Sequence, residues 1–257
     1  AVVGARSASQ LVRQDDWVII DGEAGVVIVD PSPIILAEYG FKQRQGDLER
    51  GRLARLRHKP AVTLDGQRVE LLANIEMPED TVGAVKAGAV GVGLFRSEFL
   101  FMGRESQRQT RLPDEEEQYQ AYKRAVEGMQ GMPVTIRTID VGADKPLPYL
   151  PAQTEANPFL GVRGIRLALA RPELLETQLR AVLRTSAEHP QLKVMFPMVA
   201  TLEEYRQARS ALERVREELE QAGTAVPEDL EVGVMIEVPA AALAAEAFAP
   251  EVDFFRW

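Results

Sequence analysis

The sequence predicts an α/β protein whose main domain is a β/α barrel of the TIM type, incomplete within this chain. Beyond residue 60, short and almost continuously apolar segments alternate with amphipathic segments of helical spacing. This alternation is typical of a parallel sheet that helices cover on its outer face. No glycine-rich dinucleotide motif is present, which favours a barrel over an open doubly wound sheet. Five strands and the start of a sixth are predicted from the sequence, whereas a closed barrel of this class needs eight.

Residues 1–33 are predicted to be the end of a different domain. Residues 17–21 and 26–29 are apolar, β-rich runs separated by a turn that contains Gly22 and Gly25. This pattern predicts a β-hairpin. Because two strands by themselves are marginally stable in water, we expect the hairpin to belong to a domain whose earlier part lies outside this chain.

Residues 34–60 differ in character, since they are rich in Glu, Arg, Lys and Gln with scattered apolar residues. We interpret them as a helical linker that is interrupted near Gly40 and Gly46. The basic run at residues 50–59 is interpreted as a solvated helix face.

The barrel domain is predicted over residues 61–257. Its strands are expected at 69–75, 90–95, 134–139, 194–199 and 232–238, with another beginning at 252. Its helices are expected at 79–86, near 114–130, from Pro172 onward and from Thr201 onward. Proline is favoured in a first helical turn, and the Thr201–Glu204 pair predicts a capping box. Gly223 predicts the end of the last of these helices.

Composition excludes several classes of function. The chain has 257 residues, a formal net charge of −9 and no cysteine. Without cysteine this stretch has no disulfide, no thiolate zinc site and no thiol nucleophile. The acidic balance argues against a nucleic-acid partner. No apolar run approaches the roughly 20 residues of a membrane span, and no signal-peptide pattern opens the sequence, so we expect no membrane insertion and a cytoplasmic location.

Charged residues stand at the ends of three otherwise apolar strands, namely Arg96, Arg137 and Glu237. Barrel active sites are built at the C-terminal ends of the strands, so we expect the three side chains to share one opening. Two guanidinium groups can clamp a phosphate or carboxylate, and a nearby carboxylate suits Mg²⁺, which commonly bridges to phosphate. The predicted ligand is a small phosphorylated anion together with a metal.

A second interpretation of the same residues stays open. Each arginine could instead belong to a structural ion pair, for example with Glu98 or Asp140, because a buried charge needs a partner. Arg163 lies in a glycine-containing loop and could either reach the opening or cap a helix carbonyl. His58 and His189 lie outside any catalytic motif, and we expect both at the surface.

Eight longer segments carry a family resemblance. They are GVGLFRSEFLFM (91–102), PDEEEQYQAY (113–122), IRTIDVGADKPLPYL (136–150), NPFLGVRGIRLAL (157–169), TQLRAVLRTSA (177–187), VMFPMV (194–199), VGVMIEVPAAA (232–242) and EVDFF (251–255). Together they resemble phosphoenolpyruvate–protein phosphotransferase, enzyme I of the bacterial sugar phosphotransferase system. Residues 15–31 resemble the last hairpin of that family's swivelling phosphohistidine domain.

The resemblance implies a phosphoenolpyruvate-binding barrel that uses Mg²⁺. In this family a histidine on the swivelling domain takes the phosphoryl group from phosphoenolpyruvate and hands it to the carrier protein HPr. Arg96 and Arg137 match the family's phosphoenolpyruvate-binding arginines, and Arg163 matches a further active-site arginine. Glu237, in the segment MIEVP, matches a Mg²⁺ ligand. The resemblance also implies a homodimeric full-length enzyme.

Several features depart from the family pattern. The phosphohistidine motif is absent, as are the second metal carboxylate and the general-acid cysteine that follow EVDFF in the family. We therefore expect a fragment with no catalytic residue of its own and no activity by itself. Ala143 stands where the family usually has glycine, and the segment 103–112 is longer and more basic than usual. Such a segment would suit a protein that fuses enzyme I to other phosphotransferase modules.

Two other functions remain as alternatives. Pyruvate phosphate dikinase and phosphoenolpyruvate synthase share the barrel. In those enzymes we would expect histidine and methionine where this chain has Phe99 and Phe159, respectively. A stand-alone, non-catalytic binding domain with a degenerate barrel would also lack the missing catalytic groups.

Overall fold

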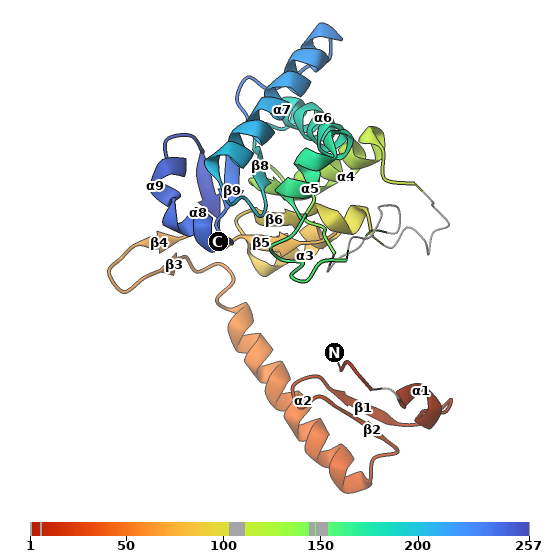
Figure 1. Ribbon diagram of the computed structural model, residues 1–257. Coiled ribbons are helices and arrows are strands. Elements are labelled where there is room, and N and C mark those ends of the chain that lie inside the picture. Colours follow the sequence, from red (N-terminus) through yellow and green to blue (C-terminus); the bar gives the residue numbers. More distant parts are fainter. Residues whose placement is uncertain (1, 6, 103–110, 144–146, 148–153, 257) are drawn as a thin grey trace. The chain divides into compact units, whose positions relative to one another are not determined.

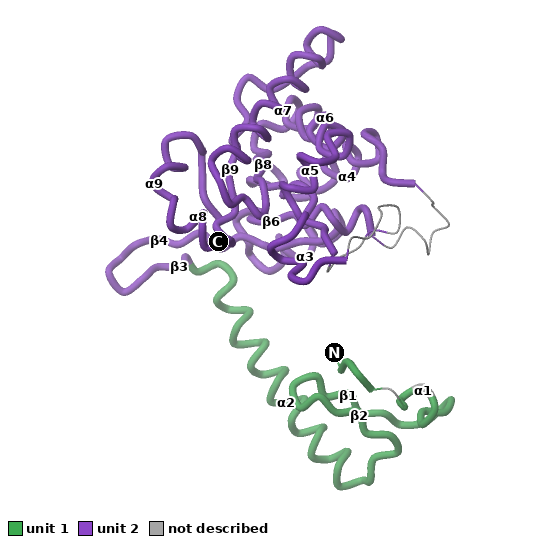
Figure 2. The backbone as a smooth tube through the Cα atoms, viewed as in Figure 1, with its two compact units in different colours: residues 1–59 green, residues 60–257 purple. Residues whose placement is uncertain are grey.

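The structure, a computed structural model, describes residues 2–5, 7–102, 111–143, 147 and 154–256. The chain divides into two units, residues 1–59 and residues 60–257 (Figure 2). Within the described residues, no helix combines the length and the apolar character that a membrane span needs.

The first unit contains the predicted hairpin and a long helix (Figure 1). Its elements are α1 Ala8–Leu11, β1 Val18–Asp21, β2 Val26–Val29 and α2 Pro33–Ala54. The two strands pair in antiparallel register, which confirms the predicted hairpin. At the turn, Asp21 Oδ1 accepts the backbone N–H groups of Glu23 and Ala24, both at 3.0 Å. A side chain that bonds to the backbone two and three residues ahead stabilises a tight turn.

Helix α2 corrects the prediction of an interrupted linker helix. It runs through Gly40 and Gly46 as one segment of 22 residues. A glycine costs about 1 kcal/mol relative to alanine within a helix, but its backbone adopts helical angles without a steric barrier. The start of α2 is well specified, because Pro33 occupies the first turn and Ser32 Oγ accepts the N–H of Ile35 at 3.4 Å.

The second unit contains a short hairpin and a parallel sheet covered by helices (Figure 1). The hairpin pairs β3 Ala61–Val62 with β4 Arg68–Val69. The sheet strands are β5 Ala73–Ile75, β6 Val92–Arg96, β7 Val134–Arg137, β8 Leu192–Phe196, β9 Val232–Met235 and β10 Phe254–Arg256. The helices are α3 Asp80–Ala87, the 3-10 helix η1 Ser97–Leu100, α4 Glu115–Gly128, α5 Ile165–Ala170, α6 Pro172–Glu188, α7 Leu202–Gln221, α8 Pro239–Leu243 and α9 Ala245–Phe248.

The order of the strands defines the architecture. In the described residues the six-stranded sheet has the order β10-β9-β8-β7-β6-β5, and each neighbouring pair is parallel. An open doubly wound sheet reverses its strand order at a switch point, whereas a barrel adds each strand beside the previous one. The sheet therefore confirms the α/β class and the incomplete β/α barrel.

The expected strand at 69–75 is two separate strands in the structure. Val69 belongs to the antiparallel hairpin with β3, whereas Ala73–Ile75 pairs in parallel with β6. Because β4 pairs with β3 and β5 pairs with β6, the chain must leave the extended conformation between β4 and β5. The apolar run showed no sign of this break, because hydrophobicity does not specify which strand is the partner.

The predicted capping signals of α7 are confirmed. Thr201 Oγ1 accepts the N–H of Glu204 at 3.2 Å, and the Glu204 carboxylate accepts the N–H of Thr201 at 2.9 Å. Gly223 follows the helix with a φ of 73°, a left-handed conformation that glycine adopts without strain. An equivalent capping box, made by Asp114 and Glu117, begins α4.

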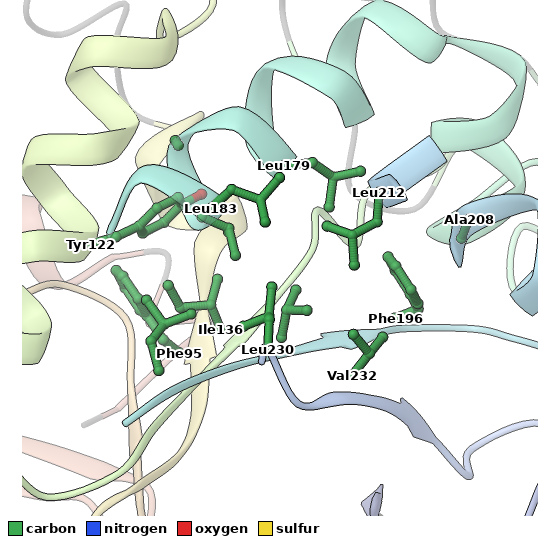
Figure 3. Packing of buried hydrophobic residues seen from close by; sticks show 14 of the residues in the cluster. Phe95, Tyr122, Ile136, Leu179, Leu183, Phe196, Ala208, Leu212, Leu230 and Val232 are labelled. Carbon is green, nitrogen blue, oxygen red and sulfur yellow. The ribbon is translucent and has the colours of Figure 1, made fainter. Parts of the chain in front are cut away.

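The core lies between the sheet and its helices (Figure 3). It contains strand residues Phe95, Ile136, Phe196 and Val232 and helix residues Tyr122, Leu179, Leu183, Ala208 and Leu212. Successive residues of a strand point to opposite faces of a sheet. Because Phe95 and Ile136 face the helices, the next residues, Arg96 and Arg137, point to the inner face of the curled sheet.

Candidate functional site

Two neighbouring strand ends bring a pair of arginines together. Arg96 is the last residue of β6, Arg137 is the last residue of β7, and the two are directly paired in register. Glu98, which follows β6 within η1, is 1% exposed. Its Oε1 accepts a hydrogen bond from Arg137 Nη2 and lies 3.5 Å from Arg96 Nε. One buried carboxylate therefore holds both guanidinium groups at the same edge of the sheet.

Asp140 links Arg137 to a third arginine. The Asp140 carboxylate accepts two hydrogen bonds from Arg163, with Nε at 2.9 Å and Nη2 at 3.1 Å. Arg137 Nη1 lies 3.4 Å from Oδ2 of the same carboxylate. A bidentate pair fixes the plane of a guanidinium as well as its distance. All three side chains are at least nine-tenths buried, so the geometry of this triad is set by packing.

Two glycines allow the Arg163 loop to approach the end of β7. A Cβ atom on Gly142 would lie 2.9 Å from the Cβ of Arg163, closer than side chains tolerate. Gly164 has a φ of 54°, and its N–H donates to the Val141 carbonyl at 3.1 Å. The side chain of Arg163 also lies over the ring of Phe159, with 4.6 Å from the guanidinium carbon to the ring centroid. The segment around Asn157-Pro158 thus carries an arginine into the site.

Arg96 is the most exposed of the three arginines. Its side chain is 27% exposed, and its Nη1 lies 2.8 Å from Oε1 of Glu76, whose side chain is 45% exposed. Ion pairs between partly exposed side chains contribute little free energy. A stronger anionic ligand can therefore replace Glu76 as the partner of Arg96 at low cost.

Glu237 lies just beyond the end of β9 and is half-buried. Its Oε1 accepts the N–H of Met198 at 2.6 Å, and Met198 itself has a left-handed backbone with a φ of 59°. Burial is the main cause of a raised pKa for Glu237, and the negative charge of Asp140 adds to it. The charges of Arg137 and Arg163 act in the opposite direction. Glu237 thus belongs to the same electrostatic group as the arginines.

The structure brings all four predicted site residues into one group, which we call the arginine cluster. Its members are Arg96, Arg137, Arg163, Glu98, Asp140 and Glu237. The ion pairs of the alternative interpretation, with Glu98 and Asp140, are also present. Structural pairing and ligand binding are compatible at Arg96, because its side chain is 27% exposed and its partner Glu76 is 45% exposed.

Sequence reasoning missed or misplaced other residues of this region. The partnership of Glu76 with Arg96 and the backbone contact of Met198 with Glu237 had no motif that could reveal them. His58 is exposed as expected. The expectation for His189 holds only in part, since it is half-buried and its Nε2 is covered. Residues 103–110, which form most of the unusual basic segment, lie outside the described residues.

The residues of the cluster fit Mg²⁺ only together with a ligand. Within the described residues, no group of three or more histidine, aspartate or glutamate side chains could hold a metal ion. Glu237 offers a hard carboxylate oxygen in a group that interacts electrostatically with Asp140. Mg²⁺ usually binds one or two carboxylates and takes its other ligands from water and substrate phosphate. This donor set therefore suits Mg²⁺ that arrives with a phosphorylated anion.

The fold and the cluster together define a β/α-barrel protein with paired arginines at adjacent strand ends. Residues 50–256 match the family described as PEP-utilising enzyme, PEP-binding domain, and the chain belongs to that family.

Curated relatives share one printed name, phosphoenolpyruvate-protein phosphotransferase. The protein of Cupriavidus necator is 54% identical over 256 residues, which are 99% of this chain and 43% of that protein. The protein of Geobacillus stearothermophilus is 50% identical over 255 residues, 99% of this chain and 43% of the relative. The protein of Bacillus subtilis is 47% identical over 255 residues, 99% of this chain and 44% of the relative. The chain thus spans less than half the length of these relatives.

Proposed function

We propose that this chain supplies the N-terminal part of the phosphoenolpyruvate-binding barrel, and with it part of the substrate and metal site, of a phosphoenolpyruvate–protein phosphotransferase, the first enzyme of a sugar phosphotransferase system. The observation that carries the proposal is the pairing of Arg96 and Arg137 at adjacent strand ends, with Glu237 in the same cluster. The family match and the names of the relatives support it. Residues 1–33 are then the last hairpin of a swivelling phosphohistidine domain.

The three arginines bind and orient the substrate. Phosphoenolpyruvate carries a phosphate and a carboxylate, and planar guanidinium groups match both through paired hydrogen bonds. Arg96 is accessible and has a replaceable partner, so it makes the first contact with the anion. Arg137 and Arg163 are held by buried carboxylates and provide fixed positive charge. A preorganised charge needs no reorganisation when the reaction occurs.

The reaction transfers a phosphoryl group to a histidine nitrogen. The bond from phosphorus to the enol oxygen breaks, a bond from phosphorus to nitrogen forms, and the electron pair stays on the oxygen as the pyruvate enolate. The enolate then takes a proton at carbon, which yields pyruvate. The arginines stabilise the negative charge that spreads over the phosphate and the leaving oxygen. Mg²⁺, held by Glu237 and the substrate, would supply further positive charge against the phosphate oxygens.

In this proposal the acceptor histidine is a residue of the swivelling domain and is neither His58 nor His189. The phosphoryl group passes from that histidine to an HPr-type carrier protein. The enzyme acts in the cytoplasm as a homodimer, and the residues of the present chain bind and orient substrate without being the nucleophile. We therefore expect no phosphohistidine when this chain alone is incubated with phosphoenolpyruvate.

Binding of phosphoenolpyruvate to the chain tests the proposal. Titration with phosphoenolpyruvate and Mg²⁺, followed by ¹H–¹⁵N NMR, should shift the signals around Arg96 and Arg137. Arg96→Gln should weaken binding by at least about tenfold, since a hydrogen bond between charged groups contributes about 1.5–3 kcal/mol. Arg171→Gln is the matched control, because Arg171 is another partly exposed arginine, with its Nη1 3.8 Å from Glu173. Equal affinity of wild type and Arg96→Gln would contradict the proposal.

A further inference from the structure

A glutamine lies on the apolar face of α6 and is completely buried. Gln178 has an exposed fraction of 0%, as do its neighbours Leu179 and Val182. Burial of an amide is unfavourable unless its donors and its acceptor all find partners. Gln178 meets this condition: Nε2 donates to Ser97 Oγ at 3.0 Å and to the Tyr122 hydroxyl at 2.8 Å. Its Oε1 accepts the backbone N–H of Ile139 at 2.8 Å.

The hydrogen bonds of Gln178 have a unique direction. A backbone N–H can only donate, so the amide oxygen must face Ile139 and the amide nitrogen must face the two hydroxyl groups. Ser97 Oγ, having accepted from Gln178, donates to the Arg137 carbonyl at 2.6 Å. The Tyr122 hydroxyl donates in turn to Gln118 Oε1 at 3.1 Å. Burial raises the pKa of Tyr122, which keeps this hydroxyl protonated.

The partners of this network hold the backbone segment that carries two members of the arginine cluster, Arg137 and Asp140. One branch reaches the carbonyl of Arg137 through Ser97, and the other reaches the N–H of Ile139 directly. Strand β7 ends at Arg137, so regular strand pairing does not continue through Ile139. The N–H of Thr138 still donates to the Met195 carbonyl of β8 at 3.0 Å, and Gln178 supplies the hydrogen bond for the next residue, Ile139. Asp140, which binds Arg163 and contacts Arg137, is the next residue along the chain.

We propose that Gln178 is a positioning residue for the anion site: it fixes the backbone from Arg137 to Asp140 and thereby the guanidinium groups of Arg137 and Arg163. This proposal rests on the proposed function, because it assigns the site a phosphorylated ligand. Gln178 does not touch the reacting groups. Its amide lies on the helix layer, and its effect passes through the end of β7 to the inner face of the sheet.

The test compares two substitutions on the same helix. Gln178→Met keeps the approximate length of the side chain and removes all three hydrogen bonds. Thr185→Val is the control, because Thr185 is also fully buried and its hydroxyl donates to the Ala181 carbonyl at 2.8 Å, within the helix. Phosphoenolpyruvate with Mg²⁺ is titrated into each folded variant, followed by NMR. We expect Gln178→Met to weaken binding by about tenfold or more, since small misplacements of a binding group are costly, and Thr185→Val to leave it unchanged.

A second measurement does not depend on the ligand. In Gln178→Met the backbone amide of Ile139 should exchange with solvent faster, and the side-chain Nε signal of Arg137 should shift and become more mobile. Thr185→Val should change neither signal. A general loss of stability would affect the whole sheet, whereas loss of positioning affects residues 137–140 first.

The outcomes separate this proposal from the proposed function. If wild type binds phosphoenolpyruvate and Gln178→Met binds it equally well, the positioning role is wrong and the function stands. If wild type does not bind, the substrate-binding role proposed for this chain is wrong, and unchanged Ile139 and Arg137 signals in Gln178→Met would overturn the positioning role as well. If Gln178→Met does not fold, Ser97→Ala replaces it, since it removes only the hydroxyl between Gln178 and the Arg137 carbonyl. Unchanged binding and unchanged Arg137 signals in folded Ser97→Ala would overturn the proposal.

Discussion

Helices α2 and α7 are similar in length and differ completely in what they bury. Helix α2 spans 22 residues and buries none of them within the described structure. Helix α7 spans 20 residues and buries six, namely Tyr205, Ala208, Ala211, Leu212, Val215 and Leu219. Both helices begin with a capped N-terminus, so the difference does not come from local helix signals.

The difference follows from how apolar residues are spaced. In α7 they recur at steps of three and four, which places them on one stripe that faces the sheet. In α2 the residues Ile34, Phe41 and Leu48 recur only once in seven positions of a strongly charged sequence, too sparsely for a continuous stripe, and all three are exposed. Most helical stability in proteins comes from the packing of an apolar stripe, not from intrinsic propensity. We therefore expect α7 to contribute more to the stability of its unit than α2 contributes to the stability of the hairpin unit.

The largest expected effect comes from removing equal side chains from the two helices. Leu212→Ala in α7 removes a fully buried side chain and should lower the free energy of unfolding of the barrel unit by about 2–5 kcal/mol. Leu48→Ala in α2 alters a side chain that is 71% exposed and should change stability by less than about 0.5 kcal/mol. Urea unfolding followed by circular dichroism measures both. Similar losses from the two substitutions would mean that α2 has a packing partner of its own.

A smaller effect is expected from the two N-caps. Thr201→Ala removes the side-chain acceptor from a complete capping box and should cost about 1 kcal/mol in the barrel unit. Ser32→Ala removes a longer hydrogen bond, 3.4 Å, from a helix without a packed face. Its effect should be confined to faster amide exchange in the first turn of α2. Exchange measured residue by residue distinguishes the two cases, and a global loss of stability from Ser32→Ala would contradict the comparison.

Glu237 should make the stability of the barrel unit depend on pH, with an effect smaller than that of the N-cap substitutions. The folded state should be more stable at acidic pH. Burial raises the pKa of Glu237 above its ordinary value of 4.5, so ionisation is harder in the folded state than in the unfolded state. The resulting stability is fully present below pH 4.5 and is lost as pH rises through the raised pKa. Unfolding midpoints of wild type and Glu237→Gln, compared across pH, measure the difference. Parallel pH profiles would show that Glu237 is not desolvated.

Asp21 in the hairpin unit should respond to pH in the opposite sense. The hydrogen bond from Lys42 is the main cause that lowers the pKa of Asp21 from 3.8 to about 2. Its stabilising contribution is present above pH 3.8 and is lost as pH falls through about 2. In Lys42→Met the pKa of Asp21 should move back toward 3.8. Carboxyl ¹³C NMR of wild type and Lys42→Met measures the pKa of Asp21. An unchanged pKa would show that Lys42 does not cause the lowering.

Local patterns predicted most elements of the fold but not their interruptions. The hairpin, the amphipathic helices and the apolar strands were predicted because each depends on residues close in sequence. The short helices α5, α8 and α9 were not predicted, since segments of four to six residues have no resolvable period. The continuous course of α2 was missed because the cost of two glycines was overestimated relative to the rest of the helix.

The sequence by itself determined that Arg96, Arg137 and Glu237 stand at strand ends, and that parallel strands bring such ends to one edge. The tertiary structure decided how these charges are paired. Asp140 and Arg163 are 23 positions apart, and Gln178 and Ser97 are 81 positions apart. Contacts over such separations depend on the packing of helices against the sheet and on strand register. A periodic pattern identifies the face on which a residue lies, whereas the partner of a buried polar group is settled only when every neighbouring element is in place.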